Sequence, residues 1–585
     1  MKKCSILLVV LSLFTLMQAE NVSTERALKI ATQYYRLSDE VSLRNSVDPL
    51  LVLAYTEKAD GVDLRSSAAP EACFYVFNSV DGEGFIIVSG DDRACPILGS
   101  SFNGAFDPDN LPPNLKAWLK QYSKEIAWMV KENPDQPADP EWAQLEAGAS
   151  PAGVELRKTV LLTTASWGQE DPYNLACPMS GSKRTATGCV ATAIAIILKY
   201  HADNGYKASG KGSHSYTWNG KTVSATFGTY DWANMPNATS SYKTTTQRTA
   251  VSKLMYNCAV SIESKFGTDA TSSNSFYAFT GLNNYFGLDK RYMRFIHKED
   301  YTDSQWKKII RNEIDKKRPV LYGGDPDAGD SGHEFVLDGY NDTSDQFHVN
   351  WGWDGSYNGY FRLTSLKGGA NPNYKNDQEM IIGIQKSVTA NASNLTYFGP
   401  EGGISVDWKR FFMRVTASKL LLRSYESFNG RLGIALIDAK GNIKQIVAER
   451  EDEELEFGYS YGILFVVNDA FSYLKTDVLR CVSSEDNGRT WNVIYGGESG
   501  ADLETLDYYS MSVEEIASQD VHVYSIPNGI VIDSPASETV QIYTLAGQLV
   551  FSGVKEAGKA TFSVSLPRGV VLVRGDGWAE KVPVK

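Results

Sequence analysis

The sequence predicts an α+β protein whose C-terminal part consists of β-rich modules. The chain has 585 residues, and its first part mixes strand-like runs with one amphipathic segment. The central part opens on a long apolar pattern of helical type and finishes in strand-like runs. Beyond residue 386 the pattern changes to short alternating strands. A chain of this length cannot bury its apolar residues in one core, so we expect about three to five domains.

Composition and charge indicate a folded protein that does not bind nucleic acid. Hydrophobic residues make up 42% of the chain and charged residues 22%, as in ordinary soluble domains. The formal net charge of -13 disfavours a nucleic-acid partner, which needs a basic face. Cys and His residues do not cluster with the spacing of zinc ligands. The sequence therefore predicts neither a metal site nor another cofactor.

The first 19 residues have the pattern of a secretory signal peptide. Lys2 and Lys3 precede an apolar run over residues 5–17, which is short for a membrane span, and Ala19 ends a small-residue cleavage signal. No later stretch of the sequence is long and apolar enough to predict a transmembrane helix. The sequence therefore predicts an exported protein that is secreted or held at the cell surface.

Residues 20–158 form the next block. The run TERALKIATQYYRL predicts an amphipathic helix, and the runs CFYVFN and GFIIVS predict strands. From Asn133 onward come four prolines with repeated Ala and Gly and no apolar period, which is typical of a linker. The linker ends in Leu156-Arg157-Lys158, a basic sequence that a protease can cut.

Three further blocks follow at residues 159–386, 387–515 and 516–585. The first is rich in Trp, Tyr and Gly and carries the long helical pattern. The second has hairpin signals at Lys440–Asn442 and at Asn487-Gly488 between alternating runs, which predicts a β-sandwich-like module. The third is a small strand-rich unit at the C-terminal end.

Six cysteines follow the predicted signal peptide. An even number in an exported protein would allow three disulfides. Their spacings are wide and irregular, however, and a large chain does not need such cross-links. If Cys189 is catalytic, at least one of the other five is also unpaired, and Cys258 has the surroundings of a small buried hydrophobe.

Cys189 is the candidate nucleophile. The segment TATGCVATAIAIILKYH predicts a helix with a wide apolar face that begins near Thr187-Gly188, which puts Cys189 in the first turn. The free N–H groups and the dipole at that end stabilise an anion, so we expect this thiol to ionise more easily. Gly188 removes side-chain bulk beside the sulfur. A buried structural cysteine at a helix start remains the alternative interpretation.

His333 is the candidate base that such a nucleophile needs. It lies in GDSGHEFVLDGY, between a Gly/Asp loop and a strand-like run, where a base is both rigid and accessible. It follows Cys189 by 144 positions, within the roughly 130–150 residues found in papain-like enzymes. His348 is the best alternative base, although we expect it to be structural. The remaining histidines are expected to have structural or solvent roles: His201 (charged, at the helix C-terminus), His214, His297 and His522.

Asn350, Trp351 and Gln169 complete the candidate site. The amide of Asn350, in FHVNWGWDG, can hold the ring of His333 in one orientation and tautomer. Trp351 and Trp353 can shield that hydrogen bond from water. Gln169, in SWGQEDPYN, is a candidate oxyanion donor together with the backbone N–H of Cys189.

With these residues named, the central block resembles the streptopain family of papain-like cysteine peptidases, including the interpain-type enzymes of oral Bacteroidetes. The resemblance implies a papain-like fold in which a helical part carries the Cys and a β part carries the His. It implies the roles of nucleophile for Cys189, base for His333, oxyanion donor for Gln169, and orienting group for Asn350 or Trp351. The matching segments, in family order, are SWGQEDPYN, TGCVATAIAIILKYH, YDWANMP, VSKLMYNCAVSI, RPVLYGG, GHEFVLDGY and FHVNWGWDGSYNGYF.

Two residues depart from the family pattern. Glu334 stands where a small residue is more usual, and Asp354 stands where the family often has Gly. We expect neither to touch the catalytic residues, although both add negative charge near the site. The resemblance implies an apolar preference for the second substrate residue before the scissile bond, in a pocket to which residues 264–275 contribute a wall.

The flanking blocks carry resemblances of their own. Residues 20–158, through GEGFIIVSGDDRACPILGSS, resemble the inhibitory prodomain of these peptidases, which implies activation by cleavage near Arg157-Lys158. Residues 516–585 resemble a type IX secretion sorting domain through VYSIPNGIVI, ETVQIYTLAGQLVFSG, LPRG and KVPVK. That resemblance implies passage across the outer membrane with the type IX secretion machinery as a partner. A free-standing adhesion module and a generic Ig-like tail are the respective alternatives.

Together these features predict a secreted cysteine endopeptidase made as a zymogen, which hydrolyses protein and peptide substrates through an acyl-enzyme. Two other functions stay open at this point. One is a surface adhesin or binding protein with a decayed peptidase core. The other is a transferase that uses the same Cys-His pair.

Overall fold

The computed structural model describes the chain in two compact units, one within residues 1–388 and the other mainly within residues 389–585. The export signal over residues 1–19 and the cleavage site at Arg157-Lys158 lie outside the described residues. The described ranges are 20–37, 50–58, 72–148, 159–289, 293–324, 333–342, 344–366, 378–386, 396–408, 413–422, 427–440, 442–456, 459–467, 471–474, 476–494, 521–545, 547–576 and 578–584.

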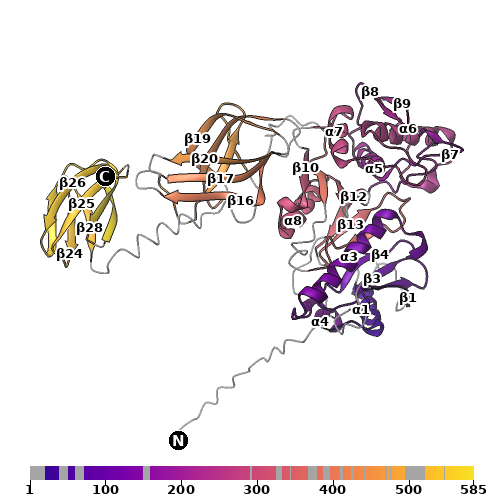
Figure 1. The fold of residues 1–585 in the computed structure, drawn as a ribbon, viewed down its shortest axis with the longest axis horizontal. Helices are drawn as coiled ribbons and strands as arrows, with labels where there is room; N and C mark the ends of the chain where they lie inside the picture. The colour runs from indigo at the N-terminus through magenta and orange to yellow at the C-terminus, as the bar shows by residue number, and fades with distance from the viewer. Residues whose placement is uncertain are drawn as a thin grey trace, which may run out of the picture. The chain divides into compact units, whose positions relative to one another are not determined.

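An eleven-stranded sheet organises the first unit (Figure 1). Its strands are antiparallel, and β5 (Thr159–Leu161) pairs with β12 outside the main path. The α+β class predicted from the sequence is confirmed. In spatial order the strands are β1 (Leu51–Glu57), β2 (Phe74–Ser79), β3 (Phe85–Ser89), β4 (Ile97–Ser101), β14 (Gly359–Phe361), β13 (Gln346–Asn350), β12 (His333–Asn341), β11 (Val320–Gly324), β15 (Glu379–Ile382) and β10 (Arg294–His297).

The sheet is continuous between the first 101 residues and the central block because β4 pairs with β14. Ser100 lies opposite Tyr360, and Gly99 lies opposite Phe361. A Cβ atom at Gly99 would stand 2.6 Å from the ring of Phe361, so only glycine allows this approach. The N-terminal strands thus extend the central sheet at its edge.

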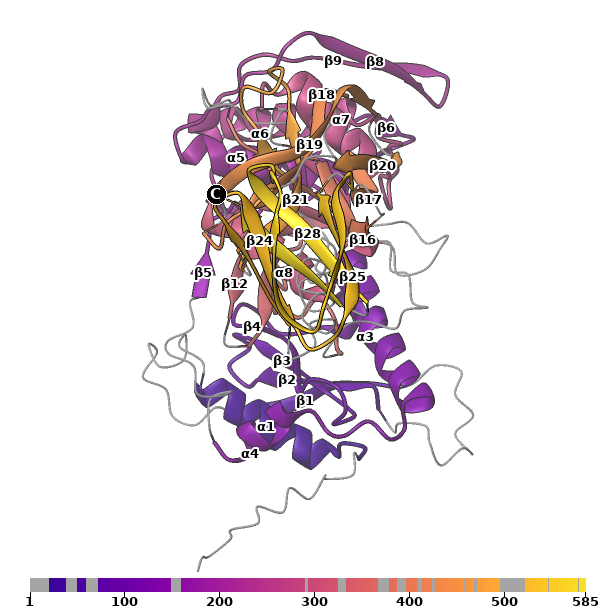
Figure 2. The same ribbon diagram turned by 90° about the vertical axis from the view of Figure 1, so that its left-hand side faces the viewer.

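Helices cover both ends of this sheet. Figures 1 and 2 place α5, α6 and α7 at one end of the unit and α1 and α4 at the other. The predicted amphipathic helix is confirmed as α1. The helices are α1 (Thr24–Leu37), α3 (Pro113–Glu132), α4 (Pro140–Glu146), α5 (Cys189–Asp203), α6 (Thr245–Ser261), α7 (Ser275–Tyr285) and α8 (Asp303–Asp315), with short 3-10 turns η1 (Pro108–Asn110), η2 (Trp232–Asn234), η3 (Thr239–Ser241) and η4 (Lys298–Asp300). Two hairpins complete the unit: β6 (Met179–Ser180) with β7 (Lys183–Arg184), and β8 (Ser213–Trp218) with β9 (Lys221–Thr226).

Helix α4 lies inside the segment that we predicted to be a linker, and that prediction is wrong over its residues. Asp139 caps the helix by accepting from the N–H of Glu141, and Pro140 occupies the first turn. Trp142 and Leu145 are both 1% exposed and pack into the core beneath α1. With only two large apolar residues, the helix is too short to produce a visible period.

The second unit contains β-rich modules with separate cores. In the first module, two sheets share a core that includes Leu432, Phe465 and Cys481, as the predicted sandwich requires. Its sheets are β16 (Thr396–Trp408), β17 (Met413–Leu422), β20 (Ser460–Val467), and β19 (Ile443–Leu455), β18 (Phe428–Ile437), β21 (Val478–Ser484), β22 (Asn492–Val493). The next module has sheets β23 (His522–Ile526), β24 (Gly529–Ser534), β27 (Gly558–Ser563), and β26 (Leu549–Lys555), β25 (Glu538–Thr544), β28 (Gly569–Gly575), β29 (Trp578–Val584).

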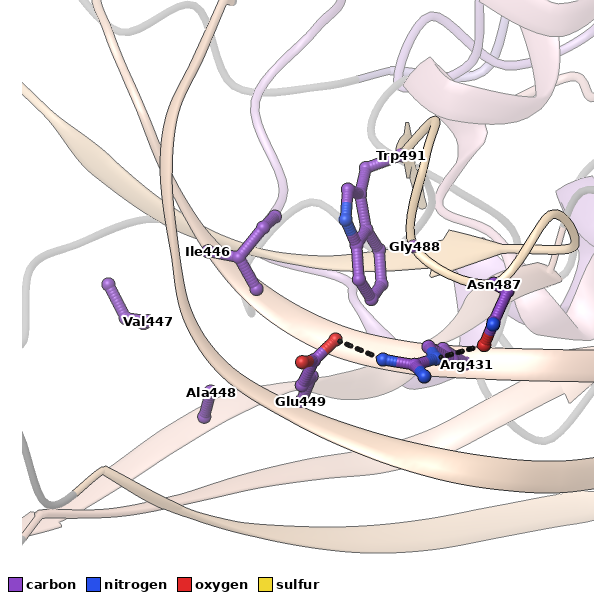
Figure 3. Close-up of a pocket in the computed structure, with 8 residues that line it drawn as sticks. All are labelled: Arg431, Ile446, Val447, Ala448, Glu449, Asn487, Gly488 and Trp491. Atoms are coloured by element: carbon purple, nitrogen blue, oxygen red, sulfur yellow. Dashed lines mark hydrogen bonds and ion pairs between the residues drawn. The ribbon is translucent and has the colours of Figure 1, made fainter.

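A pocket of about 440 Å³ lies on the β18–β19 side of the sandwich, next to Trp491 (Figure 3). Arg431 lines this pocket, and its Nε donates to Asn487 Oδ1 at 2.9 Å. Arg431 also pairs with Glu449 at 3.4 Å and with Glu451 at 3.1 Å. The guanidinium of Arg431 is therefore already paired with its neighbours in the sandwich.

The six cysteines of the described residues are all free thiols, so the three disulfides that their even number would allow are not formed. Cys258 is fully buried, as expected of a small hydrophobe. Among the described residues, none of the helices combines the length and the apolar character of a membrane span.

We expect Trp142→Ala to lower the free energy of unfolding of the full chain by about 3–5 kcal/mol, because it empties a site in the core. The indole also donates to Ala94 O at 2.9 Å and lies 4.8 Å from the guanidinium of Arg26. Denaturant unfolding of the unprocessed chain measures the effect, with the exposed change Ala143→Ser as control. Equal stability of both variants would mean that α4 is only a linker.

Candidate active site

Cys189 is the first residue of α5 and lies at the edge of the hydrophobic core. Residues such as Ile194 and Leu198 are fully buried along the helix, whereas Cys189 itself is partly exposed. This agrees with the predicted helix start. The thiol therefore stands at the helix end where backbone N–H groups lack helical partners.

Gly188 holds the backbone in a conformation that brings Cys189 to this end. Its φ is 91°, which L-residues rarely adopt, and a Cβ there would stand 2.9 Å from the carbonyl oxygen of Thr271. Thr271 in turn donates from Oγ1 to Ala186 O at 2.7 Å. The segment before Cys189 is thus held between α5 and the loop that contains Thr271.

The thiol of Cys189 lies beside a buried carboxyl group. Cys189 Sγ donates to Oε2 of Glu334, the second residue of β12, at 3.8 Å. Ser275, the first residue of α7, donates to Oε1 of the same carboxyl. The expectation that Glu334 does not touch the candidate catalytic residues is therefore wrong. Strand geometry explains the difference, because the side chain that follows His333 on β12 is the one that faces α5.

Burial and charge keep this thiol protonated. Burial, followed by the charge of Glu334, raises the pKa of Cys189 to about 12. The expected lowering by the helix N-terminus is wrong for this state, because the cost of burying a thiolate beside a carboxylate outweighs the helix dipole. Burial, together with the charge of Glu379, raises the pKa of Glu334 to about 7.

His333 opens β12, where it lies opposite Gly324 of β11. Because successive side chains in a strand alternate between its two faces, His333 is expected on the same face of β12 as Phe335 and on the opposite face from Glu334. Phe335 meets the ring of Trp118, on α3, at a centroid distance of 5.5 Å. The N-terminal part of the chain therefore packs on the face of β12 that is expected to carry His333.

Asn350 ends β13 and lies opposite Val336 of β12. It is 1% exposed, and its Nδ2 donates to Thr164 Oγ1 at 2.9 Å and to Ala165 O at 3.0 Å. Its Oδ1 accepts from the N–H of Gly352 at 3.2 Å. These contacts fix the amide close to the strand that His333 opens, and they use its two N–H donors. Only Oδ1, a carbonyl-type acceptor, is left with capacity toward an imidazole N–H.

Trp351 is fully buried between the sheet and α3. Its ring lies 4.8 Å from that of Phe335 and 6.0 Å from that of Trp118. Its Nε1 donates to Tyr357 O at 3.0 Å, and its carbonyl accepts from Asn114 Nδ2 at 2.8 Å. The indole N–H is thus engaged elsewhere, so Trp351 can act on His333 through packing rather than through a hydrogen bond.

Gln169 is hydrogen-bonded to the segment that precedes Cys189. The carbonyl of Gln169 accepts from the N–H of Thr187 at 3.0 Å, and Gln169 is 8% exposed. Asp354 lies nearby, since its N–H donates to Trp167 O at 3.1 Å and its carboxylate accepts from Thr239 at 2.6 Å. The fold therefore links the backbone of Gln169 to Thr187, which lies two residues before Cys189.

The other histidines have separate environments. His348 Nδ1 lies 2.5 Å from Oδ1 of the buried Asp338, an arrangement expected of a structural histidine. His201 is buried, and burial lowers its pKa to about 4. The expectation that His201 is charged at the helix C-terminus is therefore wrong, because desolvation outweighs the dipole. His214 lies 3.1 Å from Glu263, and His297 lies 3.6 Å from Glu379.

Helix α3 also binds the segment that follows β14. Glu125 is fully buried on α3 and accepts from Ser365 N and Oγ, both at 2.7 Å, and from Thr364 Oγ1 at 3.1 Å. Burial raises the pKa of this carboxyl. A carboxyl with so many partners anchors α3 on the central sheet.

Sequence reasoning missed Glu334 as a neighbour of Cys189, and it also missed Ser275 and Trp118. A signal existed for Glu334, which is a charged residue inside the otherwise apolar run after His333. For Ser275 and Trp118 the sequence offers no comparable signal, because their roles depend on which elements pack together.

Comparisons with known proteins match most of the first unit. The model of the Peptidase C10 family matches residues 167–361, and the model of the Spi protease inhibitor matches residues 19–126. The thiol protease/hemagglutinin PrtT of Porphyromonas gingivalis is 33% identical over 55% of this chain and 38% of its own length. Streptopain of Streptococcus pyogenes is 32% identical over 53% of this chain and 80% of its own length. The chain thus spans less than half of PrtT but most of streptopain.

Solved structures of one relative also match. A fragment of Prevotella intermedia prointerpain A is 33% identical and has a TM-score of 0.46, covering 58% of this chain and all of the fragment. Active interpain A from the same organism is 36% identical, with a TM-score of 0.34, and covers 39% of this chain and 95% of its own.

We expect Gly188→Ala to destabilise the chain by about 1–3 kcal/mol through backbone strain and to slow labelling of Cys189 in the processed protein. The control is Gly205→Ala at the other end of α5, where φ is 88° and nothing lies within 4 Å of the added Cβ. The control carries the strain without the clash. Thermal unfolding and the labelling rate with a thiol-reactive epoxide measure the two effects. Equal labelling of both variants would contradict a positioning role for Gly188.

The titration of Glu334 predicts a pH dependence of stability. The folded chain holds this proton with a pKa of about 7, against a reference value of 4.5. Its contribution is therefore full below about pH 4.5 and is lost as the pH rises through 7, by about 3 kcal/mol in all. Glu334→Gln, in a Cys189→Ala background that prevents processing, should gain stability relative to its parent between pH 5 and pH 8. Denaturant unfolding at the two pH values measures this gain, and an equal difference at both would refute it.

Proposed function

The chain belongs to the Peptidase C10 family, the family of streptopain, and is a cysteine peptidase zymogen with its own inhibitor prodomain, and from this premise we propose that it is an exported endopeptidase with Cys189 as nucleophile and His333 as general base. The observation that carries the assignment is the position of Cys189 at the N-terminus of α5, against Glu334, the second residue of β12. His333 opens that same strand. A decayed core is not favoured, since all the candidate residues are present.

In the proposed reaction, the Cys189 thiolate attacks the carbonyl carbon of the scissile peptide bond. The resulting oxyanion accepts hydrogen bonds from the side chain of Gln169 and the backbone N–H of Cys189. His333 donates its proton to the departing amine, leaving a thioester. His333 then takes a proton from water, which attacks the thioester and releases the acid product and the thiolate.

Orientation of His333 is assigned to two neighbours with different roles. Asn350 has an Oδ1 able to accept from an imidazole N–H, and its Nδ2 is held by Thr164 and Ala165. Trp351 covers this region with an apolar ring. We therefore propose Asn350 as the hydrogen-bonding partner and Trp351 as its shield.

The unprocessed chain is proposed to be inactive for electrostatic as well as steric reasons. A thiol with a pKa of about 12 forms almost no nucleophilic thiolate at neutral pH. The α3 contacts with Phe335 and Trp351 hold the face of β12 that carries His333. Cleavage near Arg157-Lys158 would free the prodomain, let water and His333 reach the thiol, and lower its pKa.

Export is part of the proposal. The pattern of residues 1–19 supports passage across the inner membrane, and the β module over residues 516–585 supports recognition by a type IX secretion system and passage across the outer membrane. Secreted or surface-held enzyme would meet protein and peptide substrates outside the cell. In the sequence, the block over residues 387–515 follows the catalytic block and precedes the module over residues 516–585.

We expect Cys189→Ala and His333→Ala each to lower peptidase activity by at least about 10³-fold, because each removes a group that acts in bond formation or proton transfer. Both variants should accumulate unprocessed chain. His348→Gln, which removes the best alternative base, should keep most of the activity. Peptide hydrolysis, electrophoresis of the secreted protein and thermal unfolding measure these outcomes. Normal processing of Cys189→Ala, or loss of activity only in a folded His348→Gln, would overturn the assignment.

A further inference from the structure

We propose that Glu334 determines specificity: its carboxylate lines the pocket for the second substrate residue before the scissile bond and selects a basic side chain there. The inference rests on the proposed function, because it takes Cys189 as the atom that attacks the substrate. It replaces the apolar preference that the family resemblance implies.

The position of the carboxyl group is the first argument. Oε2 of Glu334 lies 3.8 Å from Cys189 Sγ, so a peptide whose carbonyl carbon reaches the sulfur must pass this carboxyl. Ser275 donates to its other oxygen and belongs to the segment expected to form the wall of the second-residue pocket. The carboxyl group of Glu334 therefore meets Cys189 on one oxygen and the first residue of α7 on the other.

The charge of the site is the second argument. Glu334 is 4% exposed, and the described groups that act on it are the Ser275 hydroxyl, the Cys189 thiol and the carboxylate of Glu379. None of these three is a cation. A buried carboxylate without a cationic partner is costly, and a guanidinium or ammonium group can supply the missing charge with charge-assisted hydrogen bonds. A neutral apolar side chain would leave the acid without a cationic partner.

The chain carries a sequence that fits this pocket. If the bond between Lys158 and Thr159 is cut, Arg157 is the second residue before the scissile bond. Thr159 begins β5, which is paired with β12, so this bond is at the border of the central sheet. The basic pair in the predicted activation site and the acid beside Cys189 are thus chemically complementary.

The closing experiment compares processed wild-type, Glu334→Gln and Glu334→Ala enzymes on fluorogenic peptides with Arg, Lys, Gln or Leu as the second residue. Wild-type enzyme should show kcat/KM at least about tenfold higher for Arg than for Leu, since the site rejects a side chain that leaves its polar group unpaired. Glu334→Gln should reduce this ratio to near one. Glu334→Ala, which puts a small residue at the position, should favour Leu.

Asp342→Asn is the matched control, because it removes an acid paired with Arg311 beyond the far end of β12. The ratio should be unchanged in it. Variants that fail to process themselves are cut in trans by wild-type enzyme. Epoxide labelling of Cys189 counts active sites in each preparation, so a failure of the catalytic assignment is seen in the wild type as absent labelling and absent hydrolysis of every peptide.

Two results would overturn the proposal while the catalytic assignment stands. One is a wild-type enzyme that labels and cleaves but does not favour a basic second residue. The other is a basic preference that Glu334→Gln retains. A parallel series that varies the residue next to the scissile bond identifies a preference located there, which would likewise remove Glu334 from the second-residue pocket.

Discussion

Strand β12 is buried along nearly all its length, with helices packed against it, and the arrangement of the first unit follows from this requirement. Helix α5 packs against the strand and brings Cys189 to Glu334, while α3 brings Trp118 to Phe335. Because successive side chains in a strand alternate between faces, adjacent residues meet different partners. A base and an acid that are neighbours in sequence therefore belong to different environments in the unprocessed chain.

The prodomain is held to the enzyme by contacts that a cut in the linker does not break. Strand β4 extends the sheet through β14, and buried Glu125 binds Ser365. Cleavage removes only the covalent tether, which turns an intramolecular contact into one that dilution can separate. Release then has to expose Trp351 and the edge of β14. Unpaired strand edges and apolar rings are costly in water, so separation is expected to be slower than cleavage.

How much could be read from the sequence depends on the range of the interactions involved. The start of α5 at Cys189 and of β12 at His333 follow from local patterns, and both are confirmed. The contact of Glu334 with the thiol could not be read in this way, because it requires the orientation of β12 against α5. Helix α4 escaped notice because its stability comes from burying Trp142, not from a periodic pattern. Likewise, the raised pKa of Cys189 depends on burial, which no helix-start argument contains.

In the proposed function, the charges around Cys189 connect latency with specificity. An active thiolate and an ionised Glu334 would place two negative charges 3.8 Å apart, and their repulsion favours protonation of one of them. The helix N-terminus contributes roughly half a positive charge, and a protonated His333 contributes one more. These positive charges together fall short of the two negative charges by about half a charge. A basic substrate side chain on Glu334 would supply the remainder, so the substrate that fits the pocket would also help to ionise the nucleophile that cleaves it.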